Sequence, residues 1–260
     1  MSGPNVFDLS GKISVITGAG SGLGRAFCEA MAESGSDVVC VDINKDLANE
    51  TAEIISQHKV KVLALQGDVS SQEDVEGVFR AVDLEFGKLD VLINNAGIST
   101  KSTPLHKMPL ESWNKVISVN LTAVFLCMKE GIRLMLRQRK GSIINISSVS
   151  GLRGTGAKGP YSASKGGVIA LTKSAAVDYG PYNIRVNTIA PGVVKGTGLP
   201  YSTGMSREEV ERFYARGASE APLGRLADPF EWKGLAIYLA SDASSFITGA
   251  VLVAAGGSYR

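Results

Sequence analysis

Short apolar runs rich in valine and isoleucine alternate along the chain with segments whose apolar residues recur at helical spacing. The predicted strands span residues 13–17, 37–41, 61–66, 91–94, 142–147, 185–190 and 250–253. The clearest helical patterns span residues 23–33, 72–86, 109–137, 161–179 and 229–240. Strands that are apolar throughout and followed by helices are typical of a parallel sheet with both faces buried. The pattern therefore predicts an α/β fold.

One segment departs from this alternation. Residues 193–224 contain several glycines and prolines and only one short helical pattern, at 207–217. A long insertion after a strand in a compact sheet is usually a functional loop. We expect a lid, although a surface excursion would have the same composition. Because no linker, repeat or low-complexity tract is present, we expect residues 1–260 to form a single domain that carries this lid.

The first predicted strand leads into a glycine-rich turn that opens a helix, Thr17-Gly18-Ala19-Gly20-Ser21-Gly22-Leu23-Gly24. Glycines let backbone amides approach a pyrophosphate, and the helix N-terminus adds unpaired N–H groups and the positive end of its dipole. A tight turn without a ligand can have a similar composition. The position between a strand and a helix favours a dinucleotide site made of Gly18, Ser21, Gly22, Leu23 and Gly24.

Asp42 follows the second predicted strand, where an acidic side chain can accept hydrogen bonds from the adenosine ribose. Its charge would repel the additional phosphate of NADP, and no lysine or arginine lies within the turn before Gly22. Lys45 is near enough to offset part of that repulsion. A solvated strand end or a helix cap would also account for Asp42. We favour NAD as the cofactor, with NADP as the alternative.

Tyr161 and Lys165 are four positions apart in a predicted helix, so their side chains share a face. An unperturbed tyrosine, with a pKa of about 10, is a poor base at neutral pH. A neighbouring ammonium lowers that pKa, and a bound NAD+ would act in the same direction. Tyr161 can then donate a proton to a carbonyl or accept one from an alcohol. Taken alone, this spacing is also common on amphipathic helices.

Further polar residues stand close to predicted strand ends. Ser148 lies thirteen positions before Tyr161, at the carboxyl edge where α/β sheets bind ligands, and its hydroxyl could hydrogen-bond a substrate oxygen. Asn94 and Asn95 end an earlier strand, and Asn120 interrupts the long apolar helix that follows. By themselves, these asparagines could equally form turns or hydrogen-bond the backbone.

Composition narrows the range of partners. The 260 residues carry 27 basic and 25 acidic side chains without a run of like charges, so we expect neither nucleic acid nor membrane as a partner. The apolar stretch 116–128 is too short to span a bilayer. The three cysteines and two histidines are widely separated, so we expect no disulfide framework and no metal site. Without a secretory pattern at its start, the chain is expected to be cytoplasmic.

Taken in order, the motifs resemble those of the short-chain dehydrogenase/reductase family over essentially the whole chain. They are Thr17-Gly18-x-x-x-Gly22-x-Gly24, Asp68-Val69, Asn94-Asn95-Ala96-Gly97, Asn120, Ser148, Tyr161-x-x-x-Lys165 and Pro191-Gly192. The resemblance implies a Rossmann-type, doubly wound sheet of seven parallel strands with helices on both faces. It also implies an NAD-dependent alcohol dehydrogenase or carbonyl reductase that commonly assembles as a homotetramer.

The resemblance further implies roles for individual residues. Tyr161 would be the acid/base, Ser148 would orient the substrate oxygen, Lys165 would hold the nicotinamide ribose, and Asn120 would hold a relay water. Asp68 is expected at the adenine. Further cofactor contacts are implied for Val69, Asn95, Ala96, Gly97, Pro191, Gly192, Val194 and Thr197.

The sequence departs from the family pattern at two positions. Gly196 stands where a threonine often contacts the nicotinamide carboxamide, and Thr197 follows one position later. Near the C-terminus, Ala255 replaces a frequent aspartate. The first departure leaves the geometry of the lid open, and neither removes a residue of the catalytic tetrad.

These observations predict hydride transfer between NAD(H) and a secondary alcohol or ketone, such as a small ketone, a cyclic alcohol or a polyol. Ser150, Leu152, Val193, Tyr201 and Phe213 are expected to line the substrate pocket, because they flank Ser148 or lie in the expected lid. A non-catalytic NAD-binding sensor and an NAD-dependent epimerase or dehydratase are the alternatives. The epimerase is disfavoured because such chains generally carry a larger C-terminal substrate domain.

Overall fold

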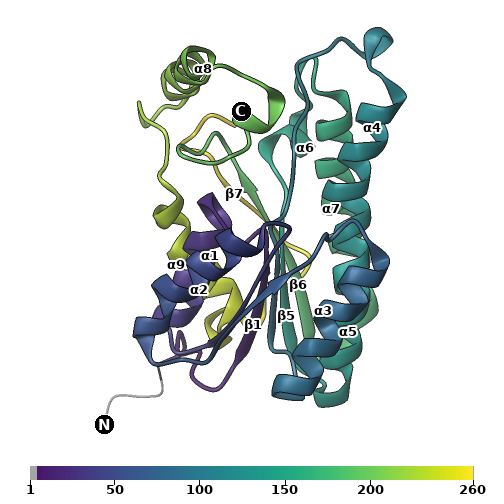
Figure 1. Ribbon diagram of the computed structural model, residues 1–260, viewed down its shortest axis with the longest axis vertical. Helices are drawn as coiled ribbons and strands as arrows, with labels where there is room; N and C mark the ends of the chain where they lie inside the picture. Colours follow the sequence, from purple (N-terminus) through teal and green to yellow (C-terminus); the bar gives the residue numbers. More distant parts are fainter. Residues whose placement is uncertain (1–4, 260) are drawn as a thin grey trace.

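Seven parallel strands form one sheet in the order β3-β2-β1-β4-β5-β6-β7 (Figure 1). The computed structural model describes residues 5–259. The strands are β1 (Ile13–Thr17), β2 (Asp37–Asp42), β3 (Val62–Gln66), β4 (Val91–Asn94), β5 (Gly141–Ile146), β6 (Ile184–Pro191) and β7 (Val251–Ala254). Every neighbouring pair is parallel, which confirms the predicted α/β fold and its doubly wound sheet.

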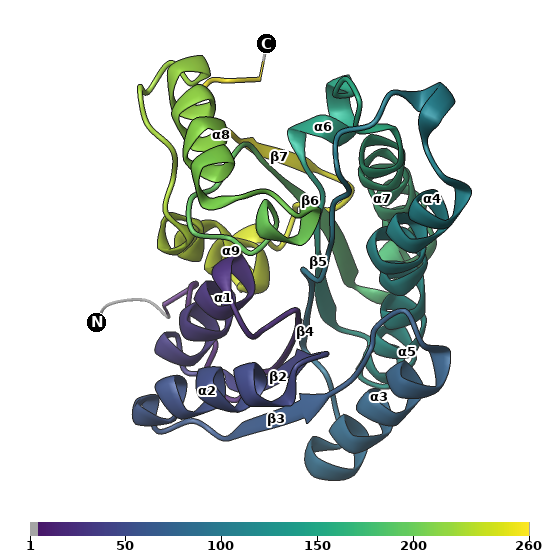
Figure 2. The ribbon, with the colours of Figure 1, turned by 45° about the horizontal axis from the view of Figure 1, so that its top comes forward.

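Helices cover both faces of the sheet. They are α1 (Gly22–Glu33), α2 (Lys45–Ile55), α3 (Gln72–Phe86), α4 (Leu110–Ile117), α5 (Ala123–Gln138), α6 (Val149–Arg153), α7 (Gly159–Tyr179), α8 (Arg207–Glu220) and α9 (Lys233–Ala240). Figure 2 shows α1, α2 and α9 on one side of the sheet, and α3, α5 and α7 on the other. The strands are therefore buried on both sides, as their continuous apolar runs require.

Two apolar cores hold these layers together. Val15 belongs to the core beneath α3, α5 and α7, whereas the next residue, Ile16, belongs to the core beneath α1, α2 and α9. Successive side chains of a strand point to opposite faces, so both residues of such a pair must be apolar. This is the physical reason why the strands show no polar alternation.

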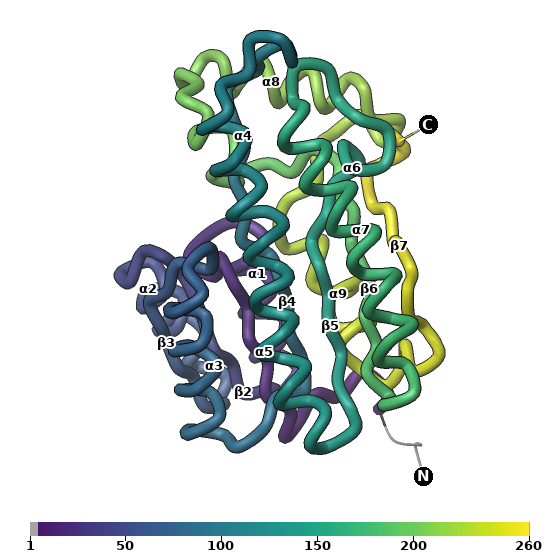
Figure 3. The backbone as a smooth tube through the Cα atoms, turned by 90° about the vertical axis from the view of Figure 1, so that its right-hand side faces the viewer, coloured from purple at the N-terminus to yellow at the C-terminus, as the bar shows by residue number. Residues whose placement is uncertain are grey.

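Strand order reverses between β1 and β4, which are neighbours in the sheet although two strands separate them in sequence. In open α/β sheets, ligands bind outside the carboxyl ends of the strands at such a switch point. The glycine-rich turn after β1 and the Asn94-Asn95 motif at the end of β4 meet there. Figures 1 and 3 show α6, α8 and the start of α4 gathered at one end of the molecule.

The predicted helix over 109–137 is not regular. It consists of α4, a π-helical turn at Ser118–Thr122 and α5, which follow one another beside α7 (Figure 3). The structure also adds α2, for which the sequence analysis gave no pattern. Asn44 caps its start by accepting hydrogen bonds from the amides of Asp46 and Leu47. Across residues 5–259, no helix is long and apolar enough to cross a bilayer.

Candidate active site

The turn between β1 and α1 can be built only with glycine at particular positions. Gly18 and Gly22 have φ angles of +64° and +52°, in the left-handed region that glycine tolerates. A Cβ atom on Gly24 would lie 1.9 Å from the carbonyl oxygen of Gly18. Ser21 precedes α1 without capping it through its side chain, and no acidic residue lies in the first turn. The helix N-terminus thus keeps amide groups for an anion, which fits a dinucleotide pyrophosphate.

The Asn94-Asn95-Ala96-Gly97 segment braces this turn from the neighbouring strand. The amides of Asn95 and Ala96 donate to Thr17 Oγ1 over 3.1 and 3.2 Å. The Asn95 side chain donates to the carbonyl oxygens of Thr17 and Gly18 over 3.0 and 3.1 Å. Asn95 therefore lies at the expected edge, but its amide nitrogen holds the protein backbone.

Asp42 lies directly against the glycine-rich turn. Its carboxylate accepts hydrogen bonds from the amides of Gly20 and Asn44, both over 2.9 Å. Arg25 also reaches this turn, donating to the carbonyl oxygen of Gly20, but it forms an ion pair of 2.9 Å with Glu50. A carboxylate thus stands beside the turn, and the nearby arginine is partly neutralised.

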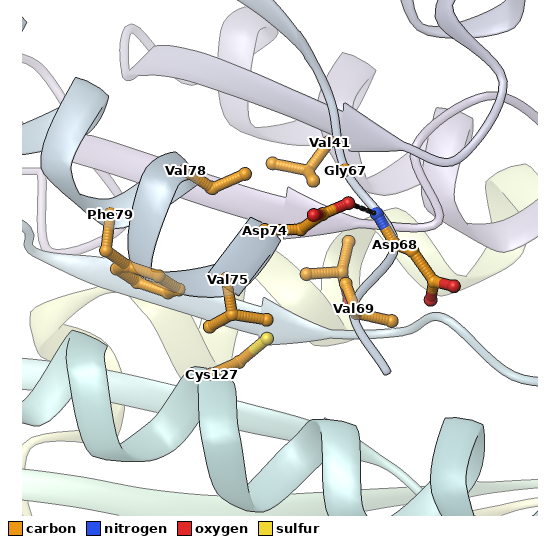
Figure 4. Close-up of a pocket in the computed structure, with 10 residues that line it drawn as sticks. Val41, Gly67, Asp68, Val69, Asp74, Val75, Val78, Phe79 and Cys127 are labelled. Atoms are coloured by element: carbon orange, nitrogen blue, oxygen red, sulfur yellow. Dashed lines mark hydrogen bonds between the residues drawn. The ribbon is translucent and has the colours of Figure 1, made fainter. Parts of the chain in front are cut away.

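Asp68 and Val69 follow β3 and line a small cavity with Val41 and Gly67 (Figure 4). Its volume of about 10 Å³ is close to the minimum for one water molecule. The Asp68 carboxylate accepts hydrogen bonds from the amide and hydroxyl of Ser70, over 2.8 and 2.7 Å. In Figure 4 it points away from Asp74, which holds the Asp68 amide over 2.9 Å.

Tyr161 and Lys165 lie on α7 with the lysine Nζ 5.9 Å from the centre of the tyrosine ring. Lys165 is buried and donates a hydrogen bond of 2.8 Å to the carbonyl oxygen of Ile146, at the end of β5. Burial disfavours the charged ammonium and lowers the pKa of Lys165 to about 8. The shared helix face expected from the four-residue spacing is thus present.

Ser148 lies at the start of α6 beside Tyr161. Its Oγ accepts a hydrogen bond of 3.1 Å from the amide of Ser150, which leaves the hydroxyl proton for a substrate or for Tyr161. Burial raises the pKa of Tyr161, and a hydrogen bond with Ser148 opposes that rise. In the polypeptide alone, removal of the phenol from water is therefore the dominant effect, and a lowering of this pKa by Lys165 with bound NAD+ stays a prediction.

Asn120 occupies the π-helical turn and is fully buried. Its side chain accepts from the amide of Ile98 over 2.8 Å and donates to the carbonyl oxygen of Ile98 over 2.9 Å. It also donates to Ser164 on α7 over 3.2 Å. A Cβ on Gly97 would lie 3.3 Å from Lys165 Nζ and 3.4 Å from Asn120 Oδ1. Asn120 therefore fastens the Gly97 loop over Lys165, and a relay water on this residue stays a prediction.

The first part of residues 193–224 approaches the glycine-rich turn. A Cβ on Gly22 would lie 3.4 Å from the Cα of Thr197, so Thr197 stands directly across from that turn. Val194, which is buried, forms a parallel bridge with Ala227 beyond the segment. Gly196 has a φ of +70°, a conformation that threonine would adopt only under strain. The backbone thus accounts for the first departure from the family pattern.

The second departure also has a structural setting. Pro191 ends β6, and a Cβ on Gly192 would lie 3.0 Å from the Cβ of Ala255. Ala255 is therefore packed against the cofactor-side loop. The following Ser258 accepts a hydrogen bond from Arg153 at the end of α6 through its carbonyl oxygen. The C-terminal segment after β7 therefore contacts both the loop after β6 and the end of α6.

The five expected substrate residues fall into two groups. Ser150 and Leu152 are half-buried in α6, where Ser150 accepts a hydrogen bond from Thr155 over 2.8 Å. Val193 packs against the backbone of α8, 3.2 Å from where a Cβ of Gly217 would lie. Tyr201 and Phe213 are 54% and 38% exposed. The structure brings the first group beside Ser148, and substrate contact stays a prediction for all five.

Lys158 and Tyr214 were missed by the sequence analysis. Lys158 precedes Tyr161 by three positions and reaches the loop after Gly97, donating to Ser99 Oγ over 3.3 Å and to the Thr100 carbonyl. Tyr214 on α8 lies at Gly196 and Thr197, and burial raises the pKa of its phenol. The feature of the sequence that could have pointed to Lys158 is its position one helical turn before Tyr161. The described part of the chain holds no cluster of metal-ligating side chains.

Comparison with known proteins places this geometry in a family. Residues 18–259 match the family described as enoyl-(acyl carrier protein) reductase. The chain is 39% identical to cis-4-hydroxycyclohexanecarboxylate dehydrogenase of Sinomonas cyclohexanicum, covering 95% of this chain and 96% of the relative. It is 38% identical to 3-oxoacyl-(acyl-carrier-protein) reductase of Thermotoga maritima, covering 96% and 98%.

The structure of NAD+-bound xylitol dehydrogenase superimposes with a TM-score of 0.88 at 33% identity, covering 96% of this chain and 99% of that one. The similarity extends over nearly the full chain for each of these relatives, whose names give different substrates. Members of the family bind a nicotinamide cofactor and are oxidoreductases. The chain belongs to the short-chain dehydrogenase/reductase family and is an oxidoreductase.

Proposed function

We propose that the protein interconverts a secondary alcohol and a ketone with NAD(H), using Tyr161 as the proton donor or acceptor. The observation that carries this proposal is the convergence of Tyr161, Ser148 and Lys165 at the carboxyl edge of β5. When bound, the nicotinamide would supply or accept the hydride. The polypeptide would have to hold the substrate oxygen and move one proton.

Ser148 and Tyr161 are suited to these two tasks. Because the Ser148 oxygen already accepts the Ser150 amide, its proton is free to hydrogen-bond a substrate oxygen. The neutral phenol of Tyr161 can protonate a developing alkoxide, and the phenolate can take the proton back. Lys165, held through Ile146, would stabilise the phenolate when charged. Asn120 would keep the Gly97 loop in place and hold a relay water that links Lys165 to solvent.

NAD is proposed over NADP because of Asp42. The carboxylate stands at the glycine-rich turn and accepts the Gly20 amide, so the additional 2′-phosphate of NADP would meet a negative charge here. Arg25, the basic side chain that contacts the turn, is paired with Glu50. The proposed cofactor contacts remain those expected from the sequence, with Thr197 across from Gly22.

For the substrate, we propose a cyclic alcohol or a polyol and the corresponding ketone. The relatives that carry this choice are the hydroxycyclohexanecarboxylate and xylitol dehydrogenases. Reduction of a 3-oxoacyl group on a carrier protein is the second candidate, favoured by the Thermotoga maritima relative. Both candidates use the same proton transfer, so the substrate must be found by assay. A sensor and an epimerase remain alternatives that turnover would exclude.

The proposal includes a homotetrameric, cytoplasmic enzyme. Phe125 on α5 and Val177 on α7 are 50% and 77% exposed, and apolar side chains on long helices favour contact between subunits. Light scattering of the purified protein tests the tetramer. A monomeric mass at working concentrations would contradict it.

The test of the function is NADH formation, followed by absorbance, with purified protein and either NAD+ or NADP+. The alcohols should include cyclic alcohols, polyols and hydroxysteroids, and a 3-oxoacyl thioester should be offered with NADH and NADPH. Turnover with NAD+ and a secondary alcohol supports the proposal. Turnover with NADP+ alone contradicts the role of Asp42. Tight NADH binding without turnover on any alcohol or ketone would favour the sensor.

A further inference from the structure

Lys158 differs from the other partly buried lysines outside the catalytic tetrad. Lys12 and Lys233, with side chains 17% and 19% exposed, pair with Asp242 and with Glu29 and Glu33, respectively. Lys158 is half-buried and its hydrogen bonds go to the hydroxyl of Ser99 and the carbonyl of Thr100, both neutral. Burial lowers the pKa of Lys158, and no carboxylate among residues 5–259 offsets this effect. A partly desolvated cation of this kind calls for an anionic partner.

The position of Lys158 links it to the reacting centre. It immediately precedes α7, one helical turn before Tyr161. Its Nζ reaches the loop that continues from Gly97 and Ile98, which Asn120 fastens over Lys165. The amide of Thr103 donates to the carbonyl of Ala157 over 2.9 Å, so the two segments are tied together. Lys158 therefore stands at the start of the helix that carries Tyr161, with its ammonium held on the neighbouring loop, and we call this place the rim.

The polar groups on this rim leave hydrogen-bonding capacity for a ligand. An ammonium has three protons, and two are used by Ser99 and Thr100. The hydroxyl of Thr100 is buried and has no hydrogen-bond partner among the described residues. One ammonium proton and one hydroxyl can serve the two oxygens of a carboxylate. A dianionic phosphate would call for more than one cation.

We propose that Lys158, together with Thr100, binds a carboxylate of the substrate, so that the enzyme acts on a hydroxy acid and its oxo acid. This inference rests on the proposed alcohol dehydrogenase function and specifies its substrate class. The carboxylate would anchor the substrate at the rim while the hydroxyl reaches Tyr161 and Ser148. Lys158 is then a residue that determines specificity, separate from the proton transfer itself.

The experiment compares hydroxy acids with their neutral amides, which keep the shape but lose the charge. We would measure kcat/KM for cis-4-hydroxycyclohexanecarboxylate, gluconate and 3-hydroxybutyrate, each beside its carboxamide. The wild type should prefer at least one acid over its amide by about 10-fold or more, the size of a charge-assisted hydrogen bond. Lys158→Met should abolish that preference through the KM of the acid and leave amide turnover within about 3-fold.

Two further variants separate charge from structure. Lys158→Arg keeps the cation and should retain most of the preference for the acid. Lys101→Met removes an exposed lysine of the same loop and should leave both substrates unchanged. Equal loss of acid and amide turnover in Lys158→Met, or an unchanged preference, would overturn the proposal.

A binding measurement keeps the inference separate from the proposed function. Calorimetry with NADH present would compare cyclohexanecarboxylate, gluconate and butyrate with their amides on wild type and Lys158→Met. Selective binding of one acid by the wild type alone supports the carboxylate site, even if no alcohol is oxidised. If neutral alcohols are turned over but no acid is selectively bound or oxidised, the proposed carboxylate site is wrong. The proposed dehydrogenase function would still hold in that case.

Discussion

The proposed cofactor side and the proposed substrate side of the site are built in opposite ways. On the cofactor side, a short glycine-rich turn is clasped by Thr17, Asn95 and Asp42 through hydrogen bonds of 2.9 to 3.2 Å. On the substrate side, α6, residues 193–224 and the C-terminal segment come from distant parts of the chain, and Tyr201 and Phe213 are 54% and 38% exposed. The first arrangement leaves little freedom for substitution. The second lets one fold accept different substrates.

The largest expected effect comes from the residue between the two sides. Tyr161→Phe removes the proton donor, and we expect kcat to fall by about 10³-fold. NADH fluorescence should report nearly unchanged cofactor binding, because the variant keeps Lys165 and the glycine-rich turn. Retention of substantial turnover would show that another group moves the proton.

On the cofactor side, Gly24→Ala should weaken cofactor binding more than any other substitution that adds a single methyl group. Its Cβ would lie 1.9 Å from the Gly18 carbonyl, so the turn must open, and we expect about 100-fold weaker NADH binding. Gly77→Ala is the matched control, because nothing lies within 4 Å of its Cβ in α3. Denaturant unfolding should show a gain of about 0.5–1 kcal/mol for the control. Equal NADH affinity in the two variants would refute the steric argument.

The pH dependence of the reaction tests the proposed proton transfer at Tyr161 in another way. Alcohol oxidation needs the phenolate. Because burial raises the pKa of Tyr161, its phenolate should form at a higher pH than that of an ordinary tyrosine when no cofactor is bound. An ultraviolet titration of wild type minus Tyr161→Phe measures this directly. Oxidation should rise with pH and carbonyl reduction should be favoured at lower pH. Reduction of the pKa below the ordinary value in the free protein would contradict the burial argument.

Asp42→Asn tests whether the charge of Asp42 selects NAD over NADP. The amide can still accept from one backbone N–H but loses the charge, and we expect about 10-fold weaker NAD+ binding with a smaller discrimination against NADP+. Steady-state kinetics with both cofactors provides the readout. Lys45→Met serves as a control for the nearby cation. If Lys45 contacts the 2′-phosphate of NADP+, this variant should show a slightly stronger preference for NAD+ over NADP+. An unchanged cofactor ratio in Asp42→Asn would remove Asp42 as the selector.

The smallest effect is expected at the rim of the substrate side. Thr197→Ala removes one hydroxyl across from Gly22, and we expect the KM for NAD+ to rise by about 3-fold, with an unchanged kcat. Thr203→Ala, whose hydroxyl caps the carbonyl of Pro200, is the control and should leave both constants unchanged. A large loss of kcat in Thr197→Ala would mean that the segment positions the nicotinamide as well.

The sequence alone was sufficient for the parallel α/β fold, the glycine-rich turn and the Tyr161–Lys165 pair. These features rest on local rules: apolar periodicity, glycine where a Cβ cannot fit, and spacing along one helix. The π-helical turn at Asn120 was not foreseen, because it depends on a buried side chain that bonds to Ile98 from another loop. Helix α2, although local, was simply not recognised.

Only the tertiary structure decided the environment of the reacting groups. The sequence placed Lys165 near Tyr161, but it did not show that burial raises the tyrosine pKa in the polypeptide alone. The packing of Ala255 on Gly192 and the contact of Lys158 with Ser99 and Thr100 likewise join residues far apart in the chain. Spacing along one element determines which side chains share a face. Desolvation and charge pairing depend on everything that packs against them, and a linear pattern does not contain that information.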